Sequence, residues 1–397
     1  MDKQAQQAMR PLGGPKGHPS STPSVPQSGT PSVALTGSRF EAMMIPGSLE
    51  PTPVASLEWE KIGFSVVVAS HMGGSIAGAD GVFEEPVVVP SGVLRIPPQA
   101  CALNYGQALF EGMKARRGVD GKIRLFRMVD NAMRMARGAG RFMMAAPSEE
   151  LYAKTVFETV KANLEYIPPE GKGSLYIQPL LAGVGMTLAP AASDVTLFMV
   201  YVQPVGSYFK GLSCIAIKAD ADYHRAAARG TGWVKAAGNY APCFMPVKKA
   251  KADGFADILF LDHEGRHVEE VGSANFAIVK NGTLYVADSP SILGGITRDS
   301  VMRVAKEALG LKVVFAPLEL DMVLGLGAYA SQGPADEAFC MGTAAVISPI
   351  GSLRWQDTDY TFGKGETGLL TTSIYERIDG IQTGRLPDTY CWTTVVD

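Results

Sequence analysis

The pattern of apolar and polar positions divides the chain into short strands and amphipathic helices. Runs rich in β-branched residues predict strands at residues 64–68, 87–89, 175–177, 196–202, 258–261, 276–279 and 284–286. Apolar residues at helical spacing predict helices over residues 130–141, 148–165, 297–309 and 321–326. Ser148 and the two acidic residues after it form a helix-capping pattern. This mixture of strands and helices predicts an α/β or α+β protein.

Changes in composition predict the domain boundaries. Residues 1–40 are rich in Pro, Ser, Thr and Gly and lack apolar periodicity, so we expect a disordered tail or a targeting segment. A break at residues 204–212 is suited to an interdomain linker. It separates a small N-terminal α/β domain over residues 57–203 from a large C-terminal domain over residues 213–397. We expect a small-molecule site in the cleft between these domains.

Charge and composition exclude several classes of protein. The chain has 36 basic and 39 acidic residues, so its net charge of −3 gives no electrostatic footprint for nucleic acid or an anionic membrane. Its longest apolar runs fall well short of the roughly 18–20 residues that a membrane span requires. The five cysteines form no CxxC pair and the five histidines are dispersed, so we expect no metal site.

The composition of the first 40 residues bears on the cellular compartment. Asp2 is their only acid, beside four basic residues, and such acid-poor, Ser-rich stretches occur in organelle transit peptides. The low cysteine content favours a reducing, intracellular compartment. A plastid or a mitochondrion is therefore one expectation, and the cytoplasm is the alternative if the segment is a plain tail.

The segment 229–240 places Lys235 in a glycine-rich, otherwise apolar stretch. Such a lysine is either a solvated loop residue or a residue held in a dry site. A desolvated lysine has a lowered pKa and becomes a nucleophile that can form a Schiff base. Spacing alone leaves both interpretations open.

Three further segments carry candidate chemistry. Glu269 and Glu270 precede a buried-looking strand, where alternation lets one carboxylate face a pocket while the other faces water. Residues 294–299 lie directly before a predicted helix, whose N-terminal amides could bind a phosphate or simply be capped. Residues 341–345 form a second turn of small residues that could offer amides to an anion.

Together these features are what pyridoxal phosphate requires: a Schiff-base lysine, a carboxylate and phosphate-binding turns. The motifs VKAAGNY around Lys235, EEVGSANF around Glu270, GGITRDS at 294–300 and CMGTAAVISP at 340–349 resemble the fold-type IV (class IV) pyridoxal-phosphate-dependent aminotransferases. NYGQALFEGMK at 104–114 resembles their branched-chain members. SLYIQPLL, VYVQPVGSYFKG and HRAAARGTG resemble the eukaryotic and plant-type forms, and the resemblance spans residues 59–396.

This resemblance implies a fold, a reaction and an assembly. The fold is that of a fold-type IV enzyme, two α/β domains with pyridoxal 5′-phosphate in the interdomain cleft. The reaction is transamination of leucine, isoleucine and valine with 2-oxoglutarate, which gives branched 2-oxo acids and glutamate. It serves either the last step of their biosynthesis or the first step of their degradation. Family members are usually homodimers, with the site near the subunit interface.

The resemblance also assigns residue roles. Lys235 would hold the cofactor through a Schiff base and then act as the acid–base group. The residues implied in binding the cofactor are Arg134, Lys235, Tyr240, Glu270, Ile296, Thr297 and Thr343. Among them Glu270 faces the pyridine nitrogen, Tyr240 bonds the ring oxygen, and Arg134 grips the phosphate. The residues implied in binding the substrate are Tyr105, Phe110, Tyr176, Gln178, Ala344 and Ala345. The apolar residues Phe110 and Tyr176 have a plain alternative as core residues.

The sequence departs from the family pattern at several positions. Gln178 stands where the family usually has arginine, which puts the grip on glutamate in question. Arg229 and Trp233 replace residues that are commonly small, so the pocket entrance is expected to differ. The segment after Ala345 lacks the CxxC of some animal members.

Two kinds of rival remain beside this interpretation. The rivals with the same fold are D-amino-acid aminotransferases and aminodeoxychorismate lyases. A rival of another class is a cofactor-binding protein without turnover.

Overall fold

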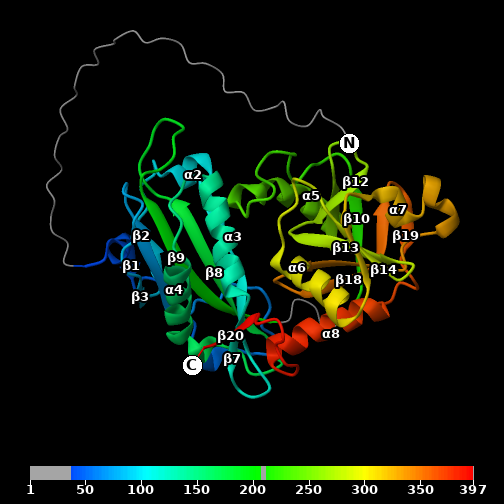
Figure 1. Ribbon diagram of the computed structural model, residues 1–397. Helices are drawn as coiled ribbons and strands as arrows, with labels where there is room; N and C mark the ends of the chain where they lie inside the picture. The colour runs from blue at the N-terminus through cyan, green and yellow to red at the C-terminus, as the bar shows by residue number, and fades with distance from the viewer. Residues whose placement is uncertain (1–36, 207–211, 397) are drawn as a thin grey trace, which may run out of the picture. The chain divides into compact units, whose positions relative to one another are not determined.

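The computed structural model of the chain describes residues 37–206 and 212–396. Within these ranges the strands form two large sheets and one small pair, and helices pack beside them (Figure 1). The longer helices are α3 (Met128–Arg141), α4 (Glu149–Lys161), α5 (Ala241–Ala252), α6 (Ile296–Arg303) and α8 (Leu369–Thr383). Shorter ones are α1 (Arg39–Met43), α2 (Cys101–Tyr105) and α7 (Leu320–Leu324). The small pair joins β1 (Met44–Pro46) to β4 (Gly92–Leu94).

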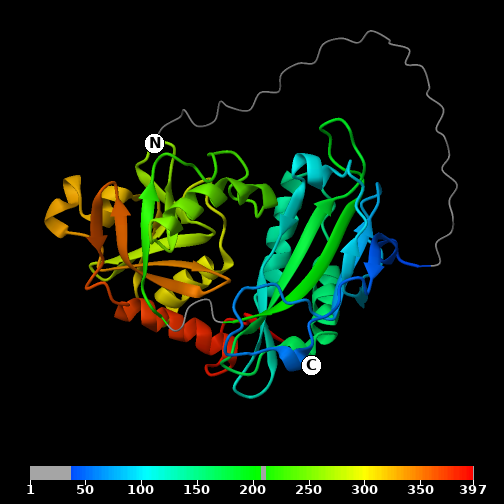
Figure 2. The same cartoon turned by 180° about the vertical axis from the view of Figure 1, so that it is seen from behind.

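The first sheet is antiparallel and comes mostly from the N-terminal half of the chain. Its strands are β2 (His71–Ala77), β3 (Val87–Pro90), β5 (Ala108–Phe110), β6 (Met113–Arg117), β7 (Ile123–Phe126), β8 (Ser174–Gly183), β9 (Thr196–Val205) and β20 (Thr393–Val396). Their order is β20-β7-β6-β8-β9-β2-β3, with β5 paired to β8. Figure 2 shows the molecule from behind, with β8 and β9 in green. Tyr152, Val156 and Val160 of α4 are fully buried in the core cluster that also contains residues of β8 and β9.

The second sheet closes on itself. Its strands are β10 (Ile215–Asp220), β11 (Asp257–Leu261), β12 (His267–Val271), β13 (Ala274–Lys280), β14 (Thr283–Ala287), β15 (Lys312–Ala316), β16 (Leu318–Glu319), β17 (Glu337–Gly342), β18 (Val346–Trp355) and β19 (Thr358–Thr361). The order runs β15-β14-β13-β17-β18-β10-β11-β12-β16, and β12 also pairs with β13. That extra pairing closes six strands, β13, β17, β18, β10, β11 and β12, into a barrel, whose mouth is a common place for a ligand site.

Most elements expected from the sequence are confirmed. Helix α3 covers the expected 130–141, and α4 begins after Ser148, whose side chain accepts a hydrogen bond from the Leu151 amide. The strand expected at 64–68 is wrong, because these residues have no regular structure, and Val66 is 83% exposed. A β-branched run makes a strand only when a neighbouring strand offers it hydrogen bonds.

The ends of the expected domains need three corrections. Phe40 belongs to α1 and is fully buried, so the tail cannot extend to residue 40. Its ring lies so close to Gly74 that a Cβ there would approach it to 2.2 Å. Val205, expected in the linker, still belongs to β9, and residues 1–36 and 207–211 lie outside the described residues. Strand β20, from the end of the expected C-terminal domain, pairs with β7 of the first sheet.

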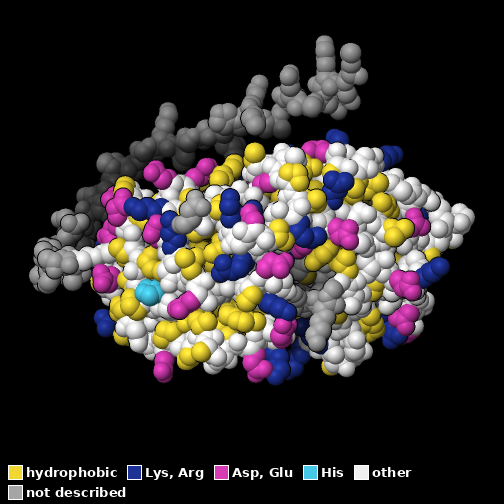
Figure 3. Space-filling model, turned by 90° about the horizontal axis from the view of Figure 1, so that it is seen from below, with side chains coloured by type: hydrophobic (Ala, Val, Ile, Leu, Met, Phe, Trp, Pro, Cys, Tyr) yellow, Lys and Arg dark blue, Asp and Glu magenta, His cyan; other side chains and the backbone are white. Residues whose placement is uncertain are grey.

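Two other kinds of feature are absent from the described residues. No helix in these ranges is long and apolar enough to cross a membrane. Within the same ranges no group of three or more His, Cys, Asp or Glu residues could hold a metal ion. Basic and acidic side chains alternate over the face seen in Figure 3, in keeping with the nearly balanced charge.

Candidate active site

A cavity of about 190 Å³ opens at one mouth of the barrel. Its walls come from the starts of β10, β11 and β13, the end of β17 and the turn before β18. The first sheet closes the cavity with Phe110 of β5 and Tyr176 of β8. Seven residues that the sequence singled out line this cavity: Phe110, Tyr176, Lys235, Tyr240, Thr343, Ala344 and Ala345.

Lys235 projects into the cavity between two aromatic rings. Its Nζ donates a hydrogen bond to the Tyr240 hydroxyl at 3.0 Å and lies 4.6 Å from the centre of the Phe110 ring. The backbone holds it there, because the Phe110 amide donates to the Lys235 carbonyl at 3.1 Å. Of the two interpretations left open by the sequence, the geometry favours the lysine held in a site over the solvated loop residue.

The glycine-rich segment around Lys235 is fixed by its own hydrogen bonds. The Asn239 side chain donates to the carbonyls of Thr231 and Val234 at 2.8 and 2.9 Å. Gly232 approaches the Ser291 carbonyl so closely that a Cβ would lie 2.1 Å from that oxygen. Glycine at this position therefore has a steric reason, and the loop is a rigid support for the lysine.

Glu270 lies on β12 and is buried among positive groups. One carboxylate oxygen accepts a hydrogen bond from Asn275 Nδ2 at 2.8 Å, and the other pairs with Arg225 Nη2 at 2.5 Å. Burial raises the pKa of Glu270 to about 7, against the opposing effect of the Arg225 and Lys235 charges. A carboxylate held in this way can face a cationic ring nitrogen, provided its charge is kept by such partners.

Glu269 corrects one expectation. Its side chain was expected to face water, but it is as buried as that of Glu270. Its Oε1 accepts hydrogen bonds from the hydroxyls of Ser289, at 3.1 Å, and Ser291. Alternation along the strand does separate the two acids, but the chain around Ser289 covers the second face as well.

Arg134, expected at a phosphate, is held by a buried carboxylate. Its Nε and Nη2 donate to the two oxygens of Glu111, at 2.9 and 2.5 Å, and its Nη1 donates to the Gly294 carbonyl at 3.0 Å. Glu111 is fully buried. Arg134 on α3 is thereby directed at the segment 294–297, which opens α6.

The start of α6 and the turn after β17 share a second, smaller cavity. Ile296, Thr297 and Thr343 are among its lining residues, and Thr343 Oγ1 donates to the Gly112 carbonyl at 3.1 Å. Nearby, the buried Nε and Nη1 of Arg298 have no hydrogen-bond partner among the described residues. An anion at this helix start would meet backbone amides together with an unsatisfied guanidinium.

Two residues expected at the substrate lie elsewhere. Gln178 lines an adjoining, mostly apolar cavity of about 580 Å³, which shares Tyr176 and Ala344 with the site. Tyr105 does not line the site cavity in this chain: it is 45% exposed and its hydroxyl donates to the Leu188 carbonyl at 2.5 Å. Of the two replacements at the lysine loop, Arg229 has a positive φ of 63° and Trp233 is 38% exposed.

Sequence reasoning missed the groups that support the named residues. Glu111, Arg225, Asn275 and Arg298 all lie inside motifs that the sequence singled out, but no role was given to them. Buried charged side chains are usually paired in folded proteins. A search of the same motifs for residues of opposite charge to Arg134 and Glu270 could therefore have suggested Glu111 and Arg225.

Comparisons with known proteins agree on one family. The sequence profile described as "Amino-transferase class IV" matches residues 108–353. The chain is 40% identical to "Branched-chain-amino-acid aminotransferase 5, chloroplastic" of Arabidopsis thaliana, over 86% of this chain and 81% of that protein. It is 40% identical to "Branched-chain-amino-acid aminotransferase 1, mitochondrial" of the same plant, over 86% and 87%. It is 37% identical to the plant's "Methionine aminotransferase BCAT4", over 90% and 98%.

Solved structures give the same result. A thermophile branched-chain amino acid aminotransferase, the T.th. enzyme complexed with N-(5′-phosphopyridoxyl)-L-glutamate, superposes with a TM-score of 0.69 at 26% identity, over 84% of this chain and all of that one. The Escherichia coli branched-chain amino acid aminotransferase gives a TM-score of 0.66 at 26% identity, over 77% and 97%.

Proposed function

The chain belongs to the class IV aminotransferase family, and we propose that it transfers the amino group of leucine, isoleucine and valine to 2-oxoglutarate with pyridoxal 5′-phosphate as cofactor. The observation that carries the proposal is the position of Lys235 in the barrel-mouth cavity, where its amine is hydrogen-bonded to Tyr240. The charge of this lysine also acts on the buried Glu270, whose pKa it lowers. The fold-type IV fold expected from the sequence is supported by the same structural relatives.

The residues present fit the cofactor. When bound, pyridoxal phosphate supplies a carbonyl for an amine and a ring that accepts electrons. The chain offers an amine at Lys235, a carboxylate at Glu270 and, at the start of α6, the unsatisfied Arg298 guanidinium. The space beside Gly294 is empty, because a Cβ built on this residue would meet no protein atom within 4 Å.

Lys235 is the acid–base group of the proposed reaction. Its Nζ would take the proton from the substrate Cα and pass it to the cofactor carbon on the other side of the amino nitrogen, two bonds away, so the same atom would have to reach both carbons. The two aromatic rings beside it exclude water from that path. Tyr240 donates its hydroxyl to the ring oxygen of the cofactor, and its bond to Lys235 keeps both groups on one side of the cavity.

Glu270 keeps a positive charge on the cofactor ring nitrogen. It can do so only as a carboxylate, although burial alone favours its neutral form. Arg225 and Asn275 hold the carboxylate by one contact on each oxygen and so favour the charged form. We assign Arg225 and Asn275 as positioning residues for Glu270.

The start of α6 would hold the cofactor phosphate. The amides of Ile296 and Thr297 would bind it, where the helix dipole favours a negative charge, and Thr343 lines the same cavity. Arg134 adds a guanidinium whose direction is fixed by Glu111. These contacts anchor the cofactor through its remote end.

The substrate carboxylate binds the amides of Ala344 and Ala345, which line the same cavity as Lys235. Phe110 and Tyr176 supply apolar walls for a branched side chain. Gln178, in the adjoining cavity, is the neutral donor for the second carboxylate of glutamate.

The assembly is a homodimer, as the family resemblance implies. A second copy would give a reason for the position of Tyr105, which is exposed, as are Leu188 and Met186, and whose hydroxyl donates to the Leu188 carbonyl. In a dimer with its sites near the interface, this edge serves the site of the partner subunit. Analytical ultracentrifugation tests the oligomeric state, and Tyr105→Ala tests the role.

The compartment is a plastid or a mitochondrion. The relatives named above as chloroplastic or mitochondrial support this, as does the acid-poor composition of residues 1–36. Import of fluorescent fusions with and without residues 1–36 tests it, and a cytoplasmic signal from both fusions contradicts it.

A substrate panel tests the reaction. The purified chain with cofactor is given each amino acid together with 2-oxoglutarate, and glutamate formation is measured. Leucine, isoleucine and valine are expected to react faster than D-alanine. Methionine is included because one relative is named for it. A lyase would release product from aminodeoxychorismate instead, and a binding protein would show cofactor absorbance that leucine leaves unchanged.

A further inference from the structure

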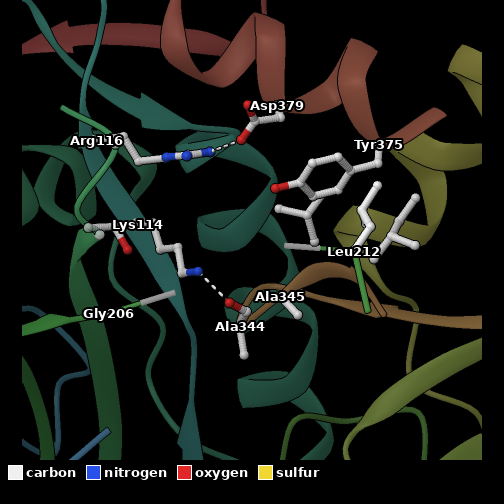
Figure 4. A pocket seen from close by; sticks show the side chains of 13 residues that line it. Lys114, Arg116, Gly206, Leu212, Ala344, Ala345, Tyr375 and Asp379 are labelled. Carbon is white, nitrogen blue, oxygen red and sulfur yellow. Dashed lines mark hydrogen bonds and ion pairs between the residues drawn. The ribbon is translucent and has the colours of Figure 1, made fainter. Parts of the chain in front are cut away.

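A further cavity, of about 110 Å³, which we call the Lys114 cavity, shares the turn residues Ala344 and Ala345 with the Lys235 cavity (Figure 4). Lys114 and Arg116 of β6 project into it from one wall, and Tyr375 and Asp379 of α8 from another. The turn therefore borders both the Lys235 cavity and the Lys114 cavity.

Within the Lys114 cavity the two basic side chains, Lys114 and Arg116, have different partners. Arg116 Nη1 donates to Asp379 Oδ1 at 2.6 Å and to Gln382 Oε1 at 3.1 Å. Lys114 Nζ donates to the Ala344 carbonyl at 2.5 Å, as the dashed line in Figure 4 marks. Of these two basic side chains, Lys114 is the one that binds the turn.

The direction of that carbonyl fixes the direction of the next amide. The Ala344 carbonyl and the Ala345 N–H belong to one peptide group, and no described peptide bond is cis. In a trans peptide the C=O and N–H point in opposite directions. Since the carbonyl points at Lys114, the Ala345 N–H points away from Lys114, and Ala345 also lines the Lys235 cavity.

The residue after the turn shows that its conformation is a strained one. Val346 has φ of +66°, which a β-branched residue rarely adopts because it is sterically strained. Such a conformation persists only where surrounding contacts impose it. Two hydrogen bonds to the first sheet and the segment before it do so: Lys114 on the Ala344 carbonyl and the Thr343 hydroxyl on the Gly112 carbonyl.

We propose that Lys114 is a positioning residue for substrate binding: by donating to the Ala344 carbonyl, it directs and polarises the Ala345 amide that binds the substrate carboxylate. A donor at one end of a peptide group strengthens the N–H at the other end as a donor. A positive charge behind the turn adds a favourable field for a carboxylate in front of it. This inference rests on the proposed function, which places the carboxylate at the turn.

The charge on Lys114 varies near neutral pH. Burial, with the nearby Arg116, lowers the pKa of Lys114 to about 7, and Asp379 opposes this. The titratable and charged groups facing Lys114 are Arg116 on its own strand and Tyr375 and Asp379 on α8. Below pH 7 the ammonium polarises the peptide fully, and above it the neutral amine does so less. Carboxylate affinity should therefore fall as the pH rises through 7.

The experiment compares the holoenzyme with two variants. Lys114→Met removes the donor and its charge. Lys280→Met is the matched control, because Lys280 also donates to backbone carbonyls, those of Gly333 at 2.6 Å and Met322 at 3.3 Å, but lies outside both cavities. The probe is 4-methylvaleric acid, the carboxylate found with a structural relative. Its dissociation constant is measured at pH 6 and pH 8.5, beside KM and kcat for leucine and the affinity for the cofactor.

Lys114→Met is expected to weaken binding of 4-methylvaleric acid about 10-fold at pH 6 and to raise KM for leucine similarly, with kcat and cofactor affinity within about threefold of wild type. Wild-type affinity should fall between pH 6 and pH 8.5, and this fall should be absent in the variant. Lys280→Met should keep wild-type affinity and pH dependence.

Unchanged affinity in Lys114→Met overturns the inference while leaving the proposed function intact. If that variant does not fold, Lys114→Arg decides, since its charge does not titrate: a pH profile like that of wild type overturns the inference. A wild-type enzyme that neither binds 4-methylvaleric acid nor converts leucine refutes the proposed function, and the inference falls with it.

Discussion

Replacing the two neighbouring acids of β12 one at a time distinguishes the effect of a charge at the cofactor from the effect of a charge buried in the core. Glu269 and Glu270 are equally buried and each accepts two contacts, so each replacement by glutamine should destabilise the fold. In Glu270→Gln the buried Arg225 loses the carboxylate that pairs with it, and this loss is felt most above pH 7, where Glu270 is ionised. In Glu269→Gln the hydroxyls of Ser289 and Ser291 lose a charged acceptor, and each hydrogen bond to a charged group contributes at most about 1.5–3 kcal/mol to stability.

Activity should separate the two variants much further than stability does. Glu270→Gln removes the charge that faces the cofactor ring, and losing one such electrostatic group costs about 10²–10³-fold in kcat. Glu269→Gln should keep kcat within about threefold of wild type, because its side chain lies on the other face of the strand with Ser289 and Ser291. Urea unfolding gives the stabilities, and leucine transamination gives kcat.

The pH dependence of unfolding gives a second check on Glu270 in the cofactor-free protein. Its folded pKa is raised to about 7 from an ordinary 4.5, so the folded state keeps the proton to a higher pH than the unfolded state. The stability that this group contributes therefore falls as the pH rises from 4.5 to 7. Glu270→Gln should lack this fall and Glu269→Gln should retain it. Equal losses of kcat in the two variants would refute the assignment of Glu270 to the cofactor.

Four other changes test separate parts of the site and fold. Lys235→Ala should abolish transamination with little change in melting temperature, and residual wild-type turnover contradicts its role. Glu111→Gln should weaken cofactor binding about 10-fold through loss of the bidentate contact that directs Arg134, measured by titrating the apoenzyme with cofactor. Gln178→Arg should raise the kcat/KM ratio of glutamate to leucine about 10-fold, since a guanidinium adds a charge-assisted bond, and an unchanged ratio places Gln178 outside the site. A chain that starts at residue 41 should unfold about 3–5 kcal/mol more easily than one that starts at residue 37, because only the second keeps the buried Phe40.

Local patterns in the sequence sufficed to predict most elements, and short motifs suggested the residues that we propose carry the chemistry. Helix α4 follows from its capping residue and its apolar spacing, and both are local properties. The residues named for the cavity sit in short motifs, so a resemblance could identify them without knowledge of the fold.

What could not be predicted depends on contacts between distant segments. Glu111 meets Arg134 across 23 residues of sequence, and Lys114 meets Ala344 across 230. The burial of Glu269 depends on the chain near Ser289, which a strand pattern cannot reveal. The missing strand at 64–68 has the same origin, since whether an apolar run pairs is decided by its neighbours.

The supporting contacts share one physical feature, which links the fold to the proposed reaction. Glu270 is held by Arg225, Arg134 is held by Glu111, and the turn at Ala344 is held by Lys114. Each of these three groups thus has a second group that fixes its direction before anything binds. Binding then spends little free energy on ordering these side chains, and their dipoles and charges already face the place where charge develops. Removing a supporting group should therefore lower affinity or rate while leaving the reacting atoms in place, which is the pattern expected above for Glu111→Gln and Lys114→Met.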